Sequence, residues 1–295
     1  MFGVVNNLFF SVVVFRVKRM RTVTNHYLVQ LAVTDILYIL FAAGERILRF
    51  TMSPIVSDKG SEGLIFGCII IPFFRSLGYF ASLFFITLVT LEMFLAICKP
   101  IKHMVLNSRG LTLKLTRGVW GSASFFAGLL ITSYCILEHY CVIWPAAETY
   151  QHLPTIAASC EPVSQWANEA HNIIQSAPFY IGLVVNITLY LCIMRSLTKK
   201  TIAPQERRPQ VHARARTRVA RMLAINCLVS FGLLAPFEIF SLVTAFKTQY
   251  GLDYRTIQLI LQILRALGYL NSAINPLVFY AVHPSYRRAF FETLA

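Results

Sequence analysis

Long apolar segments separated by short polar stretches run along the whole chain. Several exceed the roughly 20 residues that an α-helix needs to cross the hydrocarbon of a bilayer. Helices satisfy all their backbone polar groups internally, as lipid requires, so each segment is predicted to be a helix. The chain is therefore predicted to be all-α, a single domain (1–295) built as a seven-transmembrane helix bundle. The approximate spans are 1–17, 24–50, 66–98, 113–137, 170–197, 215–246 and 256–281.

The two ends of the chain depart from this pattern. Only about 15 apolar residues precede Arg16, fewer than a full span needs, and no basic region or small-residue cleavage site indicates a signal peptide. We therefore expect a truncated first helix and a native N-terminus upstream of Met1. In residues 284–294, Phe290, Phe291 and Leu294 fall on one side and Arg287 and Arg288 on the other, which predicts a short amphipathic eighth helix on the inner membrane surface.

A polar cluster interrupts the last apolar segment. Asn271, Ser272 and Asn275 stand beside the helix-breaking Pro276, and Asp35 lies in the middle of the second segment. Uncompensated polar groups are costly in hydrocarbon, so these side chains predict a polar interior shared by several helices.

Composition supports a membrane protein: 56% of residues are hydrophobic, 14% are charged and the mean hydropathy is +0.60. Soluble domains carry about 25% charged residues. The net charge of +14 would suit nucleic-acid binding, but most Lys and Arg fall in connections on one side of the bundle. The positive-inside rule makes that side cytoplasmic and places the N-terminus outside and the C-terminus inside. These charges are therefore assigned to topology and contact with membrane lipid, with no nucleic acid as partner.

Enzymes and transporters are the rival classes. An aspartyl intramembrane protease needs two acids that share a proton, and Asp35 is the only Asp within a predicted span. A serine hydrolase would need a serine beside a histidine, but the histidines of the predicted spans fall near their ends. The inverted repeats that are typical of transporters are not visible. We therefore expect a receptor and not an enzyme.

The order and spacing of several motifs resemble the rhodopsin-like (class A) G-protein-coupled receptors over essentially the whole chain. These motifs are Gly3 with Asn7, Met20–Asn25, Leu31–Asp35, Cys68, Glu92-Met93-Phe94, Trp120, Ala235-Pro236-Phe237 and Asn275-Pro276. Met20–Asn25 and Tyr269–Pro276 are most similar to the thyrotropin-releasing-hormone and neuromedin branch, which responds to peptides. The resemblance implies a plasma-membrane receptor for an extracellular peptide that signals through a heterotrimeric G protein.

The resemblance also implies a disulfide between Cys68 and Cys160, on the predicted extracellular side where disulfides persist. Cys135 and Cys141 could form a second bridge. Together with His139 they have loosely metal-like spacing, but the lack of a fourth ligand favours the simpler interpretation, a span end that enters a loop.

By the same resemblance, the polar cluster implies a bound sodium ion as an allosteric ligand; no other cofactor is expected. Its shell carries over onto Asp35, Ser82, Asn271, Ser272 and Asn275, and Asn7 would tie the first helix to it. Oxygen ligands suit a hard cation. The alternative is that Asp35 is a satisfied polar core residue without a bound ion.

Charged side chains face the outer half of the predicted bundle, where the ligand pocket is expected: Glu45, Arg46, Arg75, Glu238 and Arg265. Glu45 and Arg49 are one helical turn apart and are expected to pair. Aminergic relatives hold an acid where Arg75 stands, so a monoamine ligand is disfavoured. A net-positive pocket suits a peptide with acidic, amide or C-terminal carboxylate groups. The alternative is internal ion pairing, for instance between Arg75 and Glu238.

Several positions depart from the family pattern. The acid-arginine-tyrosine triplet reads Glu92-Met93-Phe94, and Met93 has neither a charge nor a hydrogen-bond donor. Other switch positions differ too: Leu234 replaces the tryptophan before Pro236, Ser230 replaces a phenylalanine, Phe279 replaces the tyrosine after Pro276, and alignment on Tyr190 puts Gly182 in place of the fifth-helix proline. The sequence therefore leaves two alternatives, a signalling receptor and a non-signalling or weakly coupled one.

Overall fold

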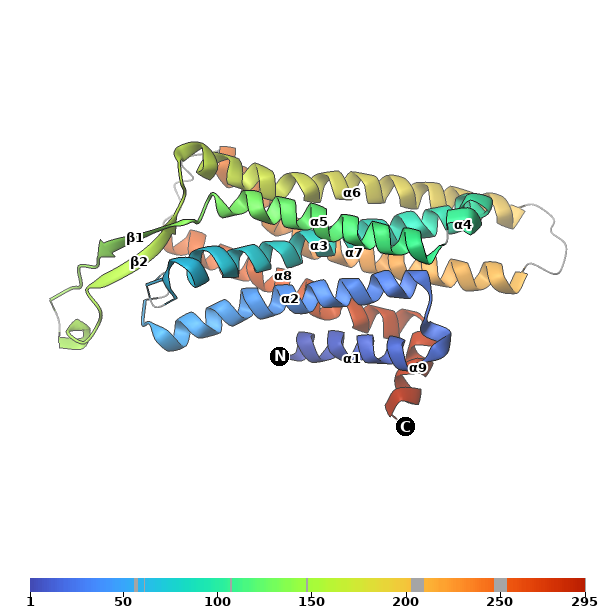
Figure 1. Ribbon diagram of the computed structural model, residues 1–295, viewed down its shortest axis with the longest axis horizontal. Helices are drawn as coiled ribbons and strands as arrows, with labels where there is room; N and C mark the ends of the chain where they lie inside the picture. Colours follow the sequence, from blue (N-terminus) through green and yellow to red (C-terminus); the bar gives the residue numbers. More distant parts are fainter. Residues whose placement is uncertain are drawn as a thin grey trace.

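The computed structural model describes residues 1–55, 58–60, 62–106, 108–146, 148–202, 210–246 and 254–294. Within that part of the chain, seven long helices lie side by side in one bundle (Figure 1): α1 (Phe2–Arg16), α2 (Val23–Met52), α3 (Ile71–Cys98), α5 (Arg109–Ile131), α6 (Gln165–Ile202), α7 (Gln210–Phe246) and α8 (Tyr254–Val282).

Shorter elements mark the two ends of the bundle. The hairpin end carries the antiparallel strands β1 (Ile136–Cys141) and β2 (Ile156–Glu161), the 3-10 helix η3 (Glu148–Tyr150) and the π-helix η2 (Gly63–Ile70), which leads into α3. The α9 end carries η1 (Lys18–Met20), α4 (Pro100–Leu106) and α9 (Pro284–Leu294). Figure 1 shows the two strands extending beyond the helices on the left, and α9 below the right-hand part of the bundle, next to α1.

Several helix boundaries follow from local chemistry. The Thr22 side chain accepts a hydrogen bond from the backbone N–H of Asn25 and so caps α2, and Ser108 caps α5 in the same way. Gly63 has a φ of +73°, a conformation that glycine adopts without steric cost, and it turns the chain into η2.

The structure corrects the predicted end of the fourth span. Helix α5 ends at Ile131 instead of residue 137, and Ile136 already begins β1. The span end near Cys135 and Cys141 was interpreted as entering a loop, but the chain there forms a hairpin, with Leu137 opposite Cys160. Pairing of the two strands provides hydrogen bonds for backbone N–H and C=O groups beyond the end of the helix. These bonds join residues far apart in the sequence, so the pattern of apolar residues did not predict them.

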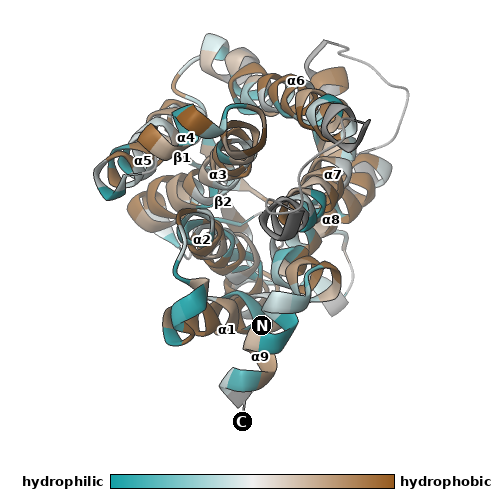
Figure 2. Ribbon diagram, turned by 90° about the vertical axis from the view of Figure 1, so that its right-hand side faces the viewer, coloured by the Kyte–Doolittle hydropathy of each residue, from teal (hydrophilic) through white to brown (hydrophobic). Residues whose placement is uncertain are grey.

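Helix α3 is the central element, packed against α2, α5, α6 and α7. Figure 2 shows it end-on, inside the ring of the other helices. Its approach to α2 is close: a Cβ on Gly78 would lie 2.8 Å from the backbone nitrogen of Tyr38. Phe80 and Phe85 on the same helix are fully buried. This tight α2–α3 contact fixes the helices that carry Asp35 and Arg75.

The outward faces of the bundle are apolar. Ile181, Val184 and Leu228 are more than 60% exposed. By length and apolar content, four helical segments of the described chain are able to cross a membrane, within Val23–Met52, Gly63–Cys98, Gln165–Thr198 and Thr217–Val243. The first helix is apolar but shorter. Exposed apolar faces around a polar interior are what lipid surroundings require.

Helix α9 packs against α1 and α8. The Phe290 ring lies 5.0 Å from that of Phe9 and 4.9 Å from that of Tyr280. Arg19 pairs with Glu292 at 2.7 Å, although both side chains are about half exposed, so this ion pair contributes little to stability. Aromatic packing therefore holds α9 in place, and the exposed Phe291 faces away from the bundle.

Candidate ligand pocket and signalling core

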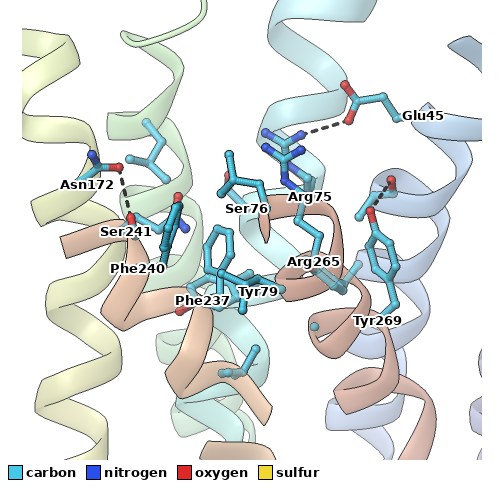
Figure 3. Close-up of a pocket in the computed structure, with 18 of the residues that line it drawn as sticks. Glu45, Arg75, Ser76, Tyr79, Asn172, Phe237, Phe240, Ser241, Arg265 and Tyr269 are labelled. Carbon is cyan, nitrogen blue, oxygen red and sulfur yellow. Dashed lines mark hydrogen bonds and ion pairs between the residues drawn. The ribbon is translucent and has the colours of Figure 1, made fainter. Parts of the chain in front are cut away.

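A cavity of about 480 Å³ opens between α2, α3, α6, α7 and α8, toward the hairpin end. Figure 3 shows its two chemically distinct sides, with Arg75 and Arg265 on one and Phe237 and Phe240 on the other. Cavities of 300–1,000 Å³ with an apolar lining and a few polar groups are typical of small-ligand sites. The predicted residues Glu45, Arg46, Arg75 and Arg265 all line it.

Glu45 is the centre of an ion-pair network beside the cavity. It is bound by Arg49, as expected from their spacing, by Lys59 and by Arg75, whose Nη1 lies 3.0 Å from Oε2. Lys59 also pairs with Glu62 at 3.2 Å. The Glu45 side chain is only 3% exposed, so its charge depends on these cations. Sequence reasoning missed Lys59 and Glu62, although their spacing of three residues was a weak signal.

Arg75 does pair internally, but not with Glu238, the partner given as an example of internal ion pairing. Arg75 is bound by Glu45 and lies over the ring of Tyr134, 5.9 Å from its centroid. Glu238 is fully buried and does not line the cavity. Its carboxylate accepts hydrogen bonds from the Tyr79 hydroxyl at 2.6 Å and the Ser176 hydroxyl at 2.7 Å. Glu238 therefore belongs to the packing of α3, α6 and α7 next to the cavity.

Two arginines of the cavity have no carboxylate partner in the described part of the chain. Within the described ranges, neither Arg46 nor Arg265 forms an ion pair, although both face the same space as Arg75. The nearby Tyr269 uses its hydroxyl to donate to the carbonyl of Ala42 at 3.3 Å. The cavity thus presents a net positive charge that its own acids do not neutralise.

The hairpin is attached to the bundle at two points. Cys68 at the start of α3 is disulfide-bonded to Cys160 of β2, with Cα atoms 5.5 Å apart, which confirms this pairing. Asp58 accepts hydrogen bonds from the backbone N–H groups of Gly60 and Ala158 and from the Ser53 hydroxyl. Burial raises the pKa of Asp58, but these donors outweigh it and hold the pKa below its usual value.

The second bridge considered for this region does not form. Cys135 and Cys141 are both free thiols. They occupy the end of the α5 turn and the end of β1, and Cys141 lies opposite Ile156 in the hairpin register. In the described part of the chain, no group of three His, Cys, Asp or Glu is arranged to hold a metal ion.

The predicted polar core assembles from four helices. The Asp35 carboxylate accepts hydrogen bonds from Asn275 Nδ2 at 2.6 Å and Ser82 Oγ at 3.3 Å. Asn7 Nδ2 donates to the carbonyl of Ser272 at 2.8 Å. All six predicted residues are buried. The Oδ1 atoms of Asn7 and Asn271 are buried acceptors without a partner among the described residues.

At the α9 end, Glu92 takes partners that were not predicted. It accepts a hydrogen bond from Thr24 Oγ1 at 2.8 Å and lies 3.1 Å from His103 Nε2. Met93 is buried in the core, and the Phe94 ring lies 5.7 Å from Lys99 Nζ. Glu92 thus joins α3 to α2 and to α4.

The sequence profile described as "7 transmembrane receptor (rhodopsin family)" matches residues 6–279. The chain belongs to this receptor family. It is similar to the thyrotropin-releasing hormone receptor of Gallus gallus (27% identity over 98% of the chain and 74% of the relative). It is also similar to the neuromedin-U receptor 2 of Homo sapiens (24%; 99% and 69%) and the bombesin receptor subtype-3 of Ovis aries (26%; 98% and 70%).

Membership makes this chain a multi-pass receptor and not an enzyme. Two of its unusual switch positions, Leu234 and Phe279, hold apolar side chains. Leu234 lines the ligand cavity. Phe279 is buried 5.3 Å from the Phe10 ring, and the neighbouring Tyr280 hydroxyl has no described hydrogen-bond partner. The Tyr190 hydroxyl accepts a hydrogen bond from Thr90 Oγ1 at 3.4 Å.

Pro236, Pro276 and Ser230 affect the shape and the contacts of α7 and α8. Pro236 and Pro276 lie inside α7 and α8, where a proline removes a backbone hydrogen bond and favours a bend. Ser230 Oγ lies 3.5 Å from Asn275 Oδ1, a long contact that connects α7 to the polar core. In place of an aromatic side chain, this position offers a small polar group.

Proposed function

We propose that the receptor binds the end of an extracellular peptide in the cavity between α2, α3, α6, α7 and α8, and signals through a heterotrimeric G protein. The observation that carries the proposal is the pair of arginines, Arg46 and Arg265, that line the cavity and have no acidic partner among the residues that the structure describes. Guanidinium groups bind carboxylates through two parallel hydrogen bonds. The three similar receptors named above are, by their names, receptors for peptides.

The ligand group expected at the arginines is a C-terminal carboxylate, an acidic side chain or an amide. The opposite side of the cavity, with Phe237 and Phe240, suits an aromatic or aliphatic side chain. The cavity volume of about 480 Å³ accommodates only a short part of a peptide. In this proposal the hairpin end faces outward and the basic connections of the α9 end face the cytoplasm.

The test of ligand class uses the full chain in a nucleotide-exchange assay with matched peptides that end in a carboxylate or an amide. Arg265→Ala is expected to lower the potency of the activating peptide by about 10- to 100-fold, because the variant loses a charge-assisted hydrogen bond to the peptide. Arg19→Ala, an exposed arginine at the α9 end, serves as control. Unchanged potency in Arg265→Ala would remove the basis of the proposal.

G-protein coupling without the usual arginine is the second part of the proposal. Met93 is buried and neutral, so it neither holds an ionic lock nor offers a donor to a G protein. The native chain and Met93→Arg are to be compared in the same assay. Exchange through the native chain supports coupling that works without the arginine. Exchange only after Met93→Arg identifies a binding receptor whose native coupling is lost.

We also propose that the polar core holds a sodium ion. The Asp35 carboxylate, the hydroxyls of Ser82 and Ser272, and the unpartnered Oδ1 of Asn271 are oxygen donors of the kind that a hard cation prefers. Bound there, the ion would offset the buried charge of Asp35 and bridge α2, α3 and α8. Such a site biases helix packing, because an ion that favours one arrangement shifts the population toward it.

A further inference from the structure

We infer that Glu238 is the positioning residue through which the ligand cavity acts on α7: its carboxylate ties α7 to α3 and α6 in the ligand-free receptor, and a ligand that engages Tyr79 releases this tie. The inference rests on the proposed function only in taking the cavity as the ligand site. Glu238, Tyr79 and Ser176 together are called the Glu238 junction below.

The geometry of the Glu238 junction joins three helices at one point. Glu238 stands on α7, Tyr79 on α3 and Ser176 on α6. The two hydroxyl oxygens lie 2.6 and 2.7 Å from the two carboxylate oxygens. Separations of this length are typical of hydroxyl donors bound to a charged carboxylate, the stronger class of hydrogen bond.

The energetics make this tie releasable. Glu45 is held by three cations, whereas no Lys, Arg or His in the described ranges forms an ion pair with the fully buried Glu238. A buried carboxyl group without a counter-charge depends on its hydrogen bonds, which here also include one to the Gln175 side chain of α6. Loss of either hydroxyl therefore raises the free energy of the packed arrangement and favours one in which α7 moves and the carboxylate finds other donors or water.

The cavity reaches the junction through side chains that a ligand would touch. Tyr79 lines the cavity, and so does Gln175, the neighbour of Ser176. Leu234, one turn before Glu238 on α7, also lines it, but it offers only apolar contact. The junction is thus a polar connection from the cavity to α7.

The position of the junction on α7 lets a local change become a movement of the whole helix. Glu238 lies two residues after Pro236, where the helix lacks a backbone hydrogen bond. Toward the α9 end, α7 contacts its neighbours through apolar packing such as Phe179 against Phe231, 5.3 Å apart, and through the long Ser230–Asn275 contact. Apolar contacts can slide, so release at the junction is expected to shift the far end of α7.

The test needs neither a ligand nor a G protein. An environment-sensitive fluorophore is placed on Arg221→Cys, an exposed position at the α9 end of α7, with the exposed Cys141 changed to Ser. Glu238→Gln, Tyr79→Phe and Ser176→Ala are compared in this background. The matched control is Ser241→Ala, which removes a 3.1 Å contact to Asn172 between the same helices α6 and α7.

Glu238→Gln and Tyr79→Phe are each expected to raise about tenfold the fraction of receptors in which the α9 end of α7 is displaced. A tenfold change in this equilibrium corresponds to about 1.4 kcal/mol. The double variant is expected to add little, because both changes break the same bond. Tyr79→Phe keeps the ring and so remains informative if Glu238→Gln does not fold. A fluorescence signal that is as unchanged as in Ser241→Ala overturns the inference, whatever the melting temperature does, and leaves the ligand proposal standing.

Discussion

The acids at the two ends of the bundle are held in different ways. At the hairpin end, Glu45 is bound by Arg49, Lys59 and Arg75. At the α9 end, Glu92 contacts the neutral hydroxyl of Thr24 and the ring of His103. Ion pairs between buried groups restrict the positions of their helices, because a buried charge that loses its partner costs free energy. The comparison indicates a preformed ligand end and an α9 end with little ionic restraint.

This difference changes where control of α7 is expected. In the triplet at the α9 end of α3, Met93 is neutral and buried, and Glu92 contacts α2 and α4. Helix α7 is therefore free of an ionic restraint from this triplet. The Glu238 junction, near the cavity, becomes its strongest described polar attachment to α3.

The largest effect is expected from Glu45→Ala. Removal of this carboxylate leaves three cations close together and partly buried, so stability should fall by about 3–5 kcal/mol. Thermal unfolding in detergent measures the change, and Glu148→Ala, an exposed acid of the hairpin loop, is the control. A loss of stability no greater than that of the control would show that the ion pairs of Glu45 do not stabilise the folded receptor.

A smaller effect is expected from Asp35→Asn, which tests the polar core between the two ends. If sodium binds Asp35, the receptor gains about 1.4 kcal/mol at a sodium concentration ten times the Kd. The melting temperature should then be higher in sodium chloride than in potassium chloride at equal ionic strength, and Asp35→Asn should abolish the difference. Equal melting temperatures for the native chain in both salts would argue for a satisfied polar core without an ion.

Glu92→Gln is expected to cost about 1 kcal/mol, since Glu92 has hydrogen-bonding partners and lacks an Arg or Lys ion pair in the described chain. Thr24→Val should have a similar effect, and the double variant should be non-additive because the two residues share one bond. Urea or thermal unfolding would measure both. A loss as large as that of Glu45→Ala would erase the contrast between the two ends.

The smallest effect is a pH dependence from Asp58, which attaches the hairpin. Its folded pKa lies below the unfolded value, so its contribution to stability is fully present above about pH 4 and is lost as the pH falls through the folded pKa. Asp58→Asn should flatten the stability curve between about pH 5 and pH 2. A curve that keeps its slope in the variant would assign the acid sensitivity to other carboxyl groups.

The helices and the polar core could be predicted from the sequence because their signals are local or chemically forced. An apolar segment has to be helical in lipid, and the side chains of Asp35 and Asn275 need polar partners there. The partners of Arg75 and Glu238 could not be predicted in the same way. Each of these side chains had several charged or hydroxyl candidates within reach, and the choice depended on Lys59 and Tyr79, whose positions follow from loop and helix packing.

The sequence by itself determined the helical bundle, the receptor family and the polar residues of its interior, since apolar length and buried polar groups leave few solutions in a membrane. Only the tertiary structure decided how charge is distributed among them. It assigned three cations to Glu45, left Arg46 and Arg265 facing the cavity, and placed Glu238 among hydroxyls. Ion pairs depend on distances of a few ångströms between helices, which no spacing along the chain specifies.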